Sequence, residues 1–254
     1  MRTTYHLNLD EMKIDGARYA FLPGDPGRVP EIALAFDPQA KEIAWKREYL
    51  TYLGRMNGQP VLVTSTGIGG PSTSSAIDEL AQLGVKTFLR VGTTGAIQPD
   101  IGIGDVIITT GAVRLDGAST HYAPIEYPAV AHHEVVHALI EAAKALGKRY
   151  HVGITASCDT FYPGQERYDS YSQYVLKRFQ GITEEWRRLH VLNYDMEAAT
   201  VLTLCSALGL KGGCVLGVIV NRTRSEHITP EDLALGERNA TQVAVAAMKR
   251  LILV

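Results

Sequence analysis

The chain has 254 residues, of which 46% are hydrophobic and 20% charged, and its formal net charge is −2. This is the composition of an ordinary globular protein that is long enough to bury a large core. The nearly balanced charge gives no reason to expect a nucleic acid or an anionic membrane as partner.

The cysteines and the N-terminal residues indicate the cellular compartment. Three cysteines, Cys158, Cys205 and Cys214, have no metal-ligand spacing and fit a reducing environment. The N-terminal residues lack the apolar core of a signal peptide, and the longest apolar run, residues 214–220, is too short to span a bilayer. We therefore expect a cytoplasmic protein.

The first predicted strand, residues 19–22, runs into the turn PGDPGR at residues 23–28, which opens a helix ending near Phe36. A glycine turn at a helix N-terminus presents free N–H groups and a positive dipole end, so together with Arg28 it can hold a phosphate. A plain turn with a solvated arginine explains the same residues. A strand predicted at residues 45–55 then leads through an Asn57-Gly58 turn into the next strand, as in a hairpin.

The rest of the chain is organised around residues 60–96, which read as strand, glycine turn, helix, strand and second glycine turn. Residues 61–65 are apolar and β-branched, residues 67–70 favour unusual backbone angles, and residues 72–83 form an amphipathic helix. The pattern predicts a right-handed βαβ unit. Ligands of open α/β sheets bind at the carboxyl ends of strands, where this unit carries hydroxyls, glycines and Arg90, a set suited to an oxyanion.

Two nucleotide-binding fingerprints are missing from this stretch. A dinucleotide-binding loop needs a third glycine where Ser72 stands and an acidic residue about twenty positions later, and residues 85–91 contain none. The sequence GxxxxGK[ST] of a triphosphate-binding loop does not occur either. We therefore expect neither a nicotinamide cofactor nor a nucleoside triphosphate.

Strands and helices alternate through the remaining sequence, without linker or repeat. The predicted elements are a strand from residue 104 to 110, an ordered loop at 111–129, a helix at 131–147, strands at 151–157 and 191–194, a helix at 198–208, a strand at 214–220, a polar segment at 224–231 suited to a mobile lid, and a closing helix at 233–254. This order predicts a single α/β domain, residues 1–254, with a mixed central β-sheet flanked by helices.

The sequence HEVVH at residues 133–137 matches the zinc pattern HExxH. Ile140 and Ala143 stand where an extended zinc pattern needs further residues. We interpret the match as accidental and the two histidines as solvated.

Aromatic and polar residues are concentrated between Cys158 and Tyr174. Phe161 can lie against a flat heterocycle, Gln165 can both accept and donate hydrogen bonds, and Arg167 can donate to a carbonyl. A polar helix start with surface tyrosines is an equally good interpretation.

A candidate carboxylate for ligand binding follows the strand predicted at residues 191–194. Glu197 either caps the next helix or accepts hydrogen bonds from a sugar diol. The later strand delivers Asn221 and Arg222 to the same edge of the sheet.

With these pieces in place, the sequence resembles the nucleoside phosphorylase family along nearly its whole length. The matching stretches are LPGDPGRV, STGIGGPSTSSAIDELAQLG, FLRVGTTGAIQ, VRLDGAS, DTFYPGQERYDSYS, NYDMEAAT and GVIVNRT. The resemblance implies a pyrimidine-specific enzyme that converts uridine and phosphate reversibly into uracil and ribose 1-phosphate. It implies inorganic phosphate as co-substrate and no organic cofactor.

The resemblance also assigns roles to residues. The implied phosphate ligands are Gly24, Arg28, Arg90, Thr93 and, from the neighbouring subunit, Arg47. The implied ribose ligands are Thr93, Met196, Glu197 and, again from the neighbouring subunit, His6. The implied uracil ligands are Thr94, Gly95, Phe161, Gln165, Arg167 and Arg222. Arg90, Glu197, Gln165 and Arg167 are the implied catalytic residues.

An oligomer follows from the same resemblance, because each site borrows residues from a neighbour. We expect a homodimer at least and a hexamer, a trimer of dimers, as the full assembly. Family members also bind a monovalent cation, which implies potassium at Glu48, Ile68 and Ser72. Many pyrimidine-specific members have Glu where Asp195 stands, so the shorter carboxylate here leaves the ribose geometry open.

Two alternatives remain at this stage. One is a purine nucleoside or methylthioadenosine phosphorylase of the same fold, although purine-specific relatives have a Ser-Asp pair where this chain has Asn221-Arg222. The other is a non-catalytic relative that binds or stores nucleosides, against which the presence of Arg28, Arg90 and Glu197 argues.

Overall fold

The computed structural model describes residues 3–253. Its strands are β1 (Tyr19–Leu22), β2 (Lys41–Lys46), β3 (Tyr49–Met56), β4 (Gln59–Thr64), β5 (Thr87–Ala96), β6 (Val106–Leu115), β7 (Ala129–Val130), β8 (Tyr150–Cys158), β9 (Asn193–Asp195) and β10 (Lys211–Asn221). Its α-helices are α1 (Glu11–Ile14), α2 (Arg28–Phe36), α3 (Gly70–Gln82), α4 (His133–Ala145), α5 (Ile182–Arg188), α6 (Ala198–Ala207) and α7 (Pro230–Ile252). Short 3-10 turns are η1 (Ala118–His121), η2 (Pro163–Gln165) and η3 (Lys177–Phe179).

One mixed sheet contains all of these strands, in the order β10-β6-β8-β9-β5-β1-β4-β3-β2, with β7 paired to β6. Because β10 also pairs with β5, the strands β5, β10, β6, β8 and β9 close into a ring. Strand β1 lies between β4 and β5 and is parallel to both, so the connection through α3 crosses over β1. As a result, β1, β4, β5 and β10 all end at the same edge of the sheet.

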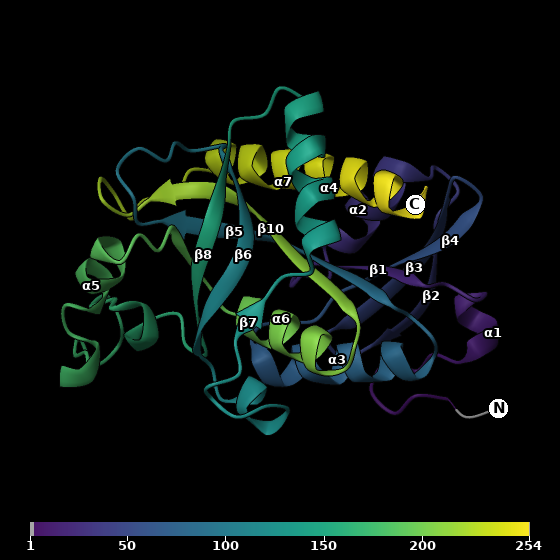
Figure 1. Cartoon of the computed structure of the whole chain (residues 1–254), viewed down its shortest axis with the longest axis horizontal. Coiled ribbons are helices and arrows are strands. Elements are labelled where there is room, and N and C mark those ends of the chain that lie inside the picture. The colour runs from purple at the N-terminus through teal and green to yellow at the C-terminus, as the bar shows by residue number, and fades with distance from the viewer. Residues whose placement is uncertain (1–2, 254) are drawn as a thin grey trace.

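Helices cover both faces of the sheet, which confirms the predicted fold class. In Figure 1, α2, α4 and α7 lie on one side, and α3 and α6 lie on the other. On the first side Ile32, Leu139 and Val243 belong to one buried cluster. On the second side Ile77 and Val201 belong to another. Burial of these apolar stripes is the main source of stability for both layers.

Helix α7 packs on β10 backbone to backbone at one point. A Cβ atom added to Gly217 of β10 would lie 2.0 Å from the carbonyl oxygen of Gly236 on α7. Only glycine allows this approach, so the pair Gly217 and Gly236 fixes the distance between α7 and the sheet.

Three predicted boundaries are wrong. The strand expected at residues 45–55 is interrupted at Arg47-Glu48, where Arg47 has φ of 56° and the chain reverses between β2 and β3. The second glycine turn, Gly92 to Gly95, belongs to β5, which runs to Ala96. The loop expected at residues 111–129 contains the end of β6, the turn η1 and the start of β7.

The reason for the second error lies in the packing. A Cβ on Gly92 would lie 2.7 Å from Leu216, and a Cβ on Gly95 would lie 3.0 Å from Arg222. These glycines therefore serve close side-chain packing around a regular strand, and no turn is needed to explain them.

The remaining sequence features are placed as follows. Cys158, Cys205 and Cys214 are free and buried. Within the HExxH match Glu134 pairs with Lys211, and residues 3–253 contain no group of three or more side chains suited to a metal ion. No helix in the described range is both long and apolar enough to cross a membrane.

Candidate active site

A cavity of about 820 Å³ opens at the carboxyl ends of β1, β4, β5 and β10, the edge where the sequence predicted an oxyanion site. Eleven of the residues predicted to bind phosphate, ribose or uracil line it: Gly24, Arg28, Arg90, Thr93, Thr94, Gly95, Phe161, Gln165, Arg167, Met196 and Glu197. They come from segments far apart in the sequence, which the fold brings together.

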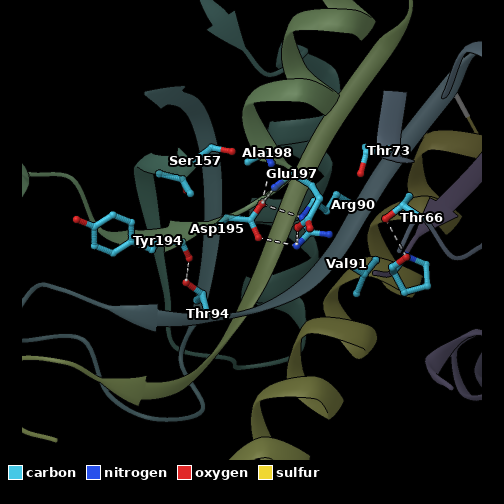
Figure 2. Close-up of polar contacts among 12 residues, drawn as sticks. Thr66, Thr73, Arg90, Val91, Thr94, Ser157, Tyr194, Asp195, Glu197 and Ala198 are labelled. Carbon is cyan, nitrogen blue, oxygen red and sulfur yellow. Dashed lines mark hydrogen bonds and ion pairs between the residues drawn. The ribbon is translucent and has the colours of Figure 1, made fainter. Parts of the chain in front are cut away.

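Arg90 of β5 lines the cavity. Figure 2 shows its guanidinium facing the carboxylates of both Asp195 and Glu197. Arg90 Nε donates to Asp195 Oδ2 at 2.9 Å and Nη2 donates to Asp195 Oδ1 at 2.5 Å, while Nη2 also pairs with Glu197. These carboxylates raise the pKa of Arg90 against the opposing effect of burial. Arg90 Nη1 is buried and has no hydrogen-bond partner among residues 3–253.

Arg28, at the start of α2, adds a second buried cation. Its Nη1 donates to the Val91 carbonyl at 3.0 Å, and its Nε lies 3.4 Å from Glu237 Oε1. Burial lowers the pKa of Arg28; nearby Glu237 opposes this, and the charge of Arg90 adds to it. In the described part of the chain no partner reaches the buried Nη2 of Arg28. A buried cation with a free N–H group is costly unless it binds an anion.

Two glycine turns lie against these arginines and are joined by backbone hydrogen bonds. Gly67 N donates to the Gly24 carbonyl at 2.9 Å, and Thr66 N donates to the Pro23 carbonyl at 2.9 Å. A Cβ on Gly24 would lie 3.3 Å from the Gly67 carbonyl oxygen and 4.0 Å from Arg90 Nη1. The missing side chain of Gly24 therefore leaves room beside the free N–H of Arg90 for an oxyanion.

Glu197 lies next to this anion site. Its Oε1 accepts from Gly69 N at 2.6 Å, and its other oxygen pairs with Arg90. Burial raises the pKa of Glu197 to about 7, although Arg90 acts in the opposite direction. The carboxylate is thus fixed at two points and can accept hydrogen bonds from the hydroxyls of a bound sugar.

Aromatic and amide groups form another part of the cavity wall. The guanidinium carbon of Arg167 lies 4.2 Å from the centre of the Phe161 ring. Gln165 is buried, and its backbone carbonyl oxygen accepts from Arg222 Nη2 at 2.9 Å. Arg167 Nε is buried, and residues 3–253 offer it no hydrogen-bond partner. The free donor and the aromatic face suit a planar ring with carbonyl groups.

Three predicted site residues do not line the cavity. Arg222 lies behind Gln165. His6 lies beside α3, where its Nδ1 is 2.8 Å from Glu79 Oε1 and its side chain is 35% exposed. Arg47 is exposed in the turn between β2 and β3.

The residues predicted to hold potassium do lie together at the cavity. Glu48, Ile68 and Ser72 line it, and Ser72 Oγ donates to the Ile68 carbonyl at 3.2 Å.

Sequence reasoning missed the role of three acidic residues that hold the arginines, although it noted Asp195 as a departure from the family pattern. Asp195 binds Arg90, Glu237 lies beside Arg28, and Glu226 pairs with both Arg167 and Arg222. Local patterns carry no signal for the first two, because each pair joins residues more than a hundred positions apart. The proximity of Glu226 to Arg222, four residues earlier, was the one available hint.

Comparisons with known proteins agree with this geometry. Residues 18–253 match the family described as the phosphorylase superfamily. The chain is 55% identical to the uridine phosphorylase of Escherichia coli strain K12 over 248 residues, 98% of both chains. It is 54% identical to the uridine phosphorylase of Haemophilus influenzae over 252 residues, which cover 99% of this chain and 100% of the relative. It is 53% identical to that of Thermococcus kodakarensis over 237 residues, 93% of this chain and 83% of the relative. The fold, the cavity and these similarities together place the chain in the phosphorylase superfamily, to which it belongs.

Proposed function

We propose that the chain is a pyrimidine nucleoside phosphorylase, an enzyme that converts uridine and phosphate into uracil and ribose 1-phosphate. The observation that carries the proposal is the pair of buried N–H groups on Arg28 and Arg90, which have no partner among residues 3–253 and lie beside the carboxylate of Glu197. An oxyanion held by these N–H groups would lie next to Glu197, whose carboxylate can accept hydrogen bonds from a sugar. Full-length similarity to several uridine phosphorylases supports the same activity.

In the proposed reaction a phosphate oxygen attacks C1′ of the ribose while the bond from C1′ to N1 of uracil breaks. The electron pair of that bond leaves with the base, so negative charge develops on the ring. Gln165 and Arg167 stand where their donors can stabilise this charge, and fixed donors of this kind act more strongly on the transition state than on the substrate. Phe161 packs against the ring, with Thr94, Gly95 and Arg222 around it.

The phosphate would be held by Gly24, Arg28, Arg90 and Thr93. A phosphate with up to two negative charges matches two arginines whose charges are partly neutralised already by Asp195, Glu197 and Glu237. Met196, Thr93 and Glu197 would hold the ribose, with Glu197 accepting from its hydroxyls. Each charge-assisted hydrogen bond contributes about 1.5 to 3 kcal/mol.

His6 and Arg47 do not line the cavity of their own chain, so we propose that they serve the neighbouring subunit's cavity. This requires a homodimer at least, and we propose a homohexamer of the whole chain, acting as one domain in the cytoplasm. Glu79 receives the backbone N–H groups of His6 and Leu7 at 2.8 Å, which holds the segment in a fixed position.

A potassium ion between subunits is a further part of the proposal. Glu48, the Ile68 carbonyl and Ser72 Oγ supply oxygen donors, the type that hard cations prefer. Bound there, the ion would balance the charge of Glu48 at the edge of the cavity. Activity in potassium chloride against the same concentration of choline chloride tests this point.

A substrate panel tests the proposed activity. Uridine and inosine are each incubated with the protein, with and without phosphate, and release of the base is measured. We expect phosphate-dependent release of uracil and little release of hypoxanthine. Turnover of inosine alone would favour a purine phosphorylase, and binding of uridine without turnover would favour a non-catalytic relative.

A further inference from the structure

Two buried arginines lie close together at the proposed base site: Arg167 lines the cavity, and Arg222 lies behind Gln165. Arg167 follows η2 and Arg222 follows β10, and their side chains are only 7% and 6% exposed. Burial lowers the pKa of Arg167, and the charge of Arg222 lowers it further. Two such cations repel each other, and without a counter-charge they would attract any anion that enters the cavity.

Glu226 supplies that counter-charge to both. Its Oε2 accepts from Arg167 Nη1 at 2.5 Å, and its Oε1 accepts from Arg222 Nε at 2.6 Å. Each carboxylate oxygen therefore serves one arginine. Within residues 3–253, no other carboxylate forms an ion pair with either of them.

The ion pairs with Glu226 also determine which N–H donors of the two arginines remain free for a ligand. Arg167 keeps a buried Nε and Arg222 a buried Nη1, both without a partner among the described residues. Arg222 Nη2 donates to the backbone carbonyl oxygen of Gln165, so the bridge also reaches the backbone beside Arg167. The orientation of both arginine side chains thus depends on one carboxylate.

We propose that Glu226 is a positioning residue that orients Arg167 and Arg222 and balances their charge, so that this end of the cavity takes a neutral pyrimidine ring. The proposal rests on the proposed function. Glu226 lies between β10 and α7, where residues 222–229 form neither helix nor strand, and its side chain is 46% exposed. Ile228 and Leu233, close by in sequence, line the cavity, so the bridge anchors a segment that contributes to its wall.

Glu226→Gln tests the proposal, because it keeps the shape of the side chain and removes its charge. The matched control is Glu184→Gln on α5: Glu184 also bridges two arginines, Arg187 and Arg188, at 43% exposure, outside the cavity. The measurements are KM for uridine and for phosphate, kcat, and inhibition by orotate, a uracil that carries a carboxylate.

We expect Glu226→Gln to raise KM for uridine about tenfold, with KM for phosphate and kcat changed by less than about threefold. We also expect orotate to inhibit this variant at least several times more strongly than the unmodified enzyme, an effect that mere loosening of the segment would not produce. The control variant should match the unmodified enzyme in every value.

An unchanged KM for uridine in Glu226→Gln would overturn the positioning role, and unchanged inhibition by orotate would overturn the charge balance. The variant Arg167→Ala distinguishes failure of the proposal for Glu226 from failure of the proposed base site. If Arg167→Ala also leaves KM and kcat for uridine unchanged, the base site itself is misplaced. Melting temperatures of all variants identify any loss of fold, and Glu226→Asp, which keeps the charge on a shorter side chain, should retain weak inhibition by orotate.

Discussion

Asp195 binds Arg90 with both carboxylate oxygens and at the same time accepts hydrogen bonds from the first backbone N–H groups of the helix that follows it. Its Oδ2 accepts from Arg90 Nε at 2.9 Å, from Glu197 N at 3.0 Å and from Ala198 N at 2.7 Å (Figure 2). The short side chain of Asp reaches its own downstream amides, which is typical of helix caps. One carboxylate thus couples the proposed phosphate ligand Arg90 to the position of the proposed ribose ligand Glu197.

Asp195→Asn should weaken phosphate binding. Asparagine still caps α6 with its single oxygen, but it loses the charge and one of the two acceptors that orient Arg90. We expect KM for phosphate to rise about tenfold and kcat/KM for uridine to fall about 10- to 100-fold, the loss of one or two charge-assisted hydrogen bonds. Initial rates at varied phosphate measure the change.

The control for this variant is Asp116→Asn. Asp116 is also buried; it accepts from Ser119 N at 2.9 Å and from Thr200 Oγ1 at 2.7 Å, but it does not line the cavity. That variant should lose stability and keep its KM for phosphate. Equal phosphate KM values in Asp195→Asn and the unmodified enzyme would refute the orienting role of Asp195.

Because of Glu197, the free energy of unfolding should fall as the pH rises. Burial raises the pKa of Glu197 from 4.5 to about 7, so between these values the folded protein keeps a proton that the unfolded chain has released. Raising the pH across this range therefore lowers the free energy of unfolding, and above about 7 the effect is complete.

Glu197→Gln lacks this titration, so its melting temperature relative to the unmodified enzyme should increase from about pH 5 to about pH 7 and then level off. Thermal unfolding in phosphate-free buffer measures the difference, and the exposed Glu126→Gln serves as control. A difference that does not change with pH would contradict the burial of an ionising Glu197.

Subunit mixing tests whether Arg47 acts across an interface. Arg47→Ala and Arg167→Ala should each be weakly active alone, because one loses a residue given to the neighbour and the other loses a residue of its own cavity. In a mixed dimer one cavity has both intact residues, so random mixing should recover about a quarter of the normal activity. Mixing His6→Ala with Arg47→Ala should recover none, since both residues would come from the same neighbour. Absence of recovery in verified mixed oligomers of the first kind would mean that sites are not shared.

The contact between Gly217 and Gly236 predicts a large loss of stability when Gly217 is replaced. In Gly217→Ala the new methyl group would overlap the Gly236 backbone, which yields only if α7 moves. We expect a loss of about 3 kcal/mol in the free energy of unfolding, measured with denaturant. Gly102→Ala, whose new Cβ would have no neighbour closer than 3.5 Å, should change it by less than about 0.5 kcal/mol. Similar midpoints for both variants would show that α7 adjusts freely.

Much of the fold was predictable, because local patterns determine it. The amphipathic helix α3, the hairpin turn at Asn57-Gly58 and the apolar strands carry periodic or turn signals within a few residues. The edge of the sheet where Arg90 and the glycine turns meet followed from the rule for parallel strands.

The structure adds what only long-range pairing can supply. The closure of β10 onto β5 turns Gly92 and Gly95 into strand residues, and the partnership of Arg90 with Asp195 spans 105 positions. The chain reversal at Arg47 depends on a positive φ that a non-glycine residue rarely adopts, so no turn signal announced it. Carboxylates that orient arginines look like ordinary acidic residues until the fold brings them together.

The three enclosed thiols have a practical consequence. Burial raises the pKa of Cys158 to about 12 and raises those of Cys205 and Cys214 as well. Thiolate is the reactive form, so alkylating reagents should modify the native enzyme slowly and the denatured chain rapidly. Cys158 ends β8, Cys205 lies in α6 and Cys214 lies in β10. The labelling rate of each cysteine therefore reports how often the strand or helix that contains it opens.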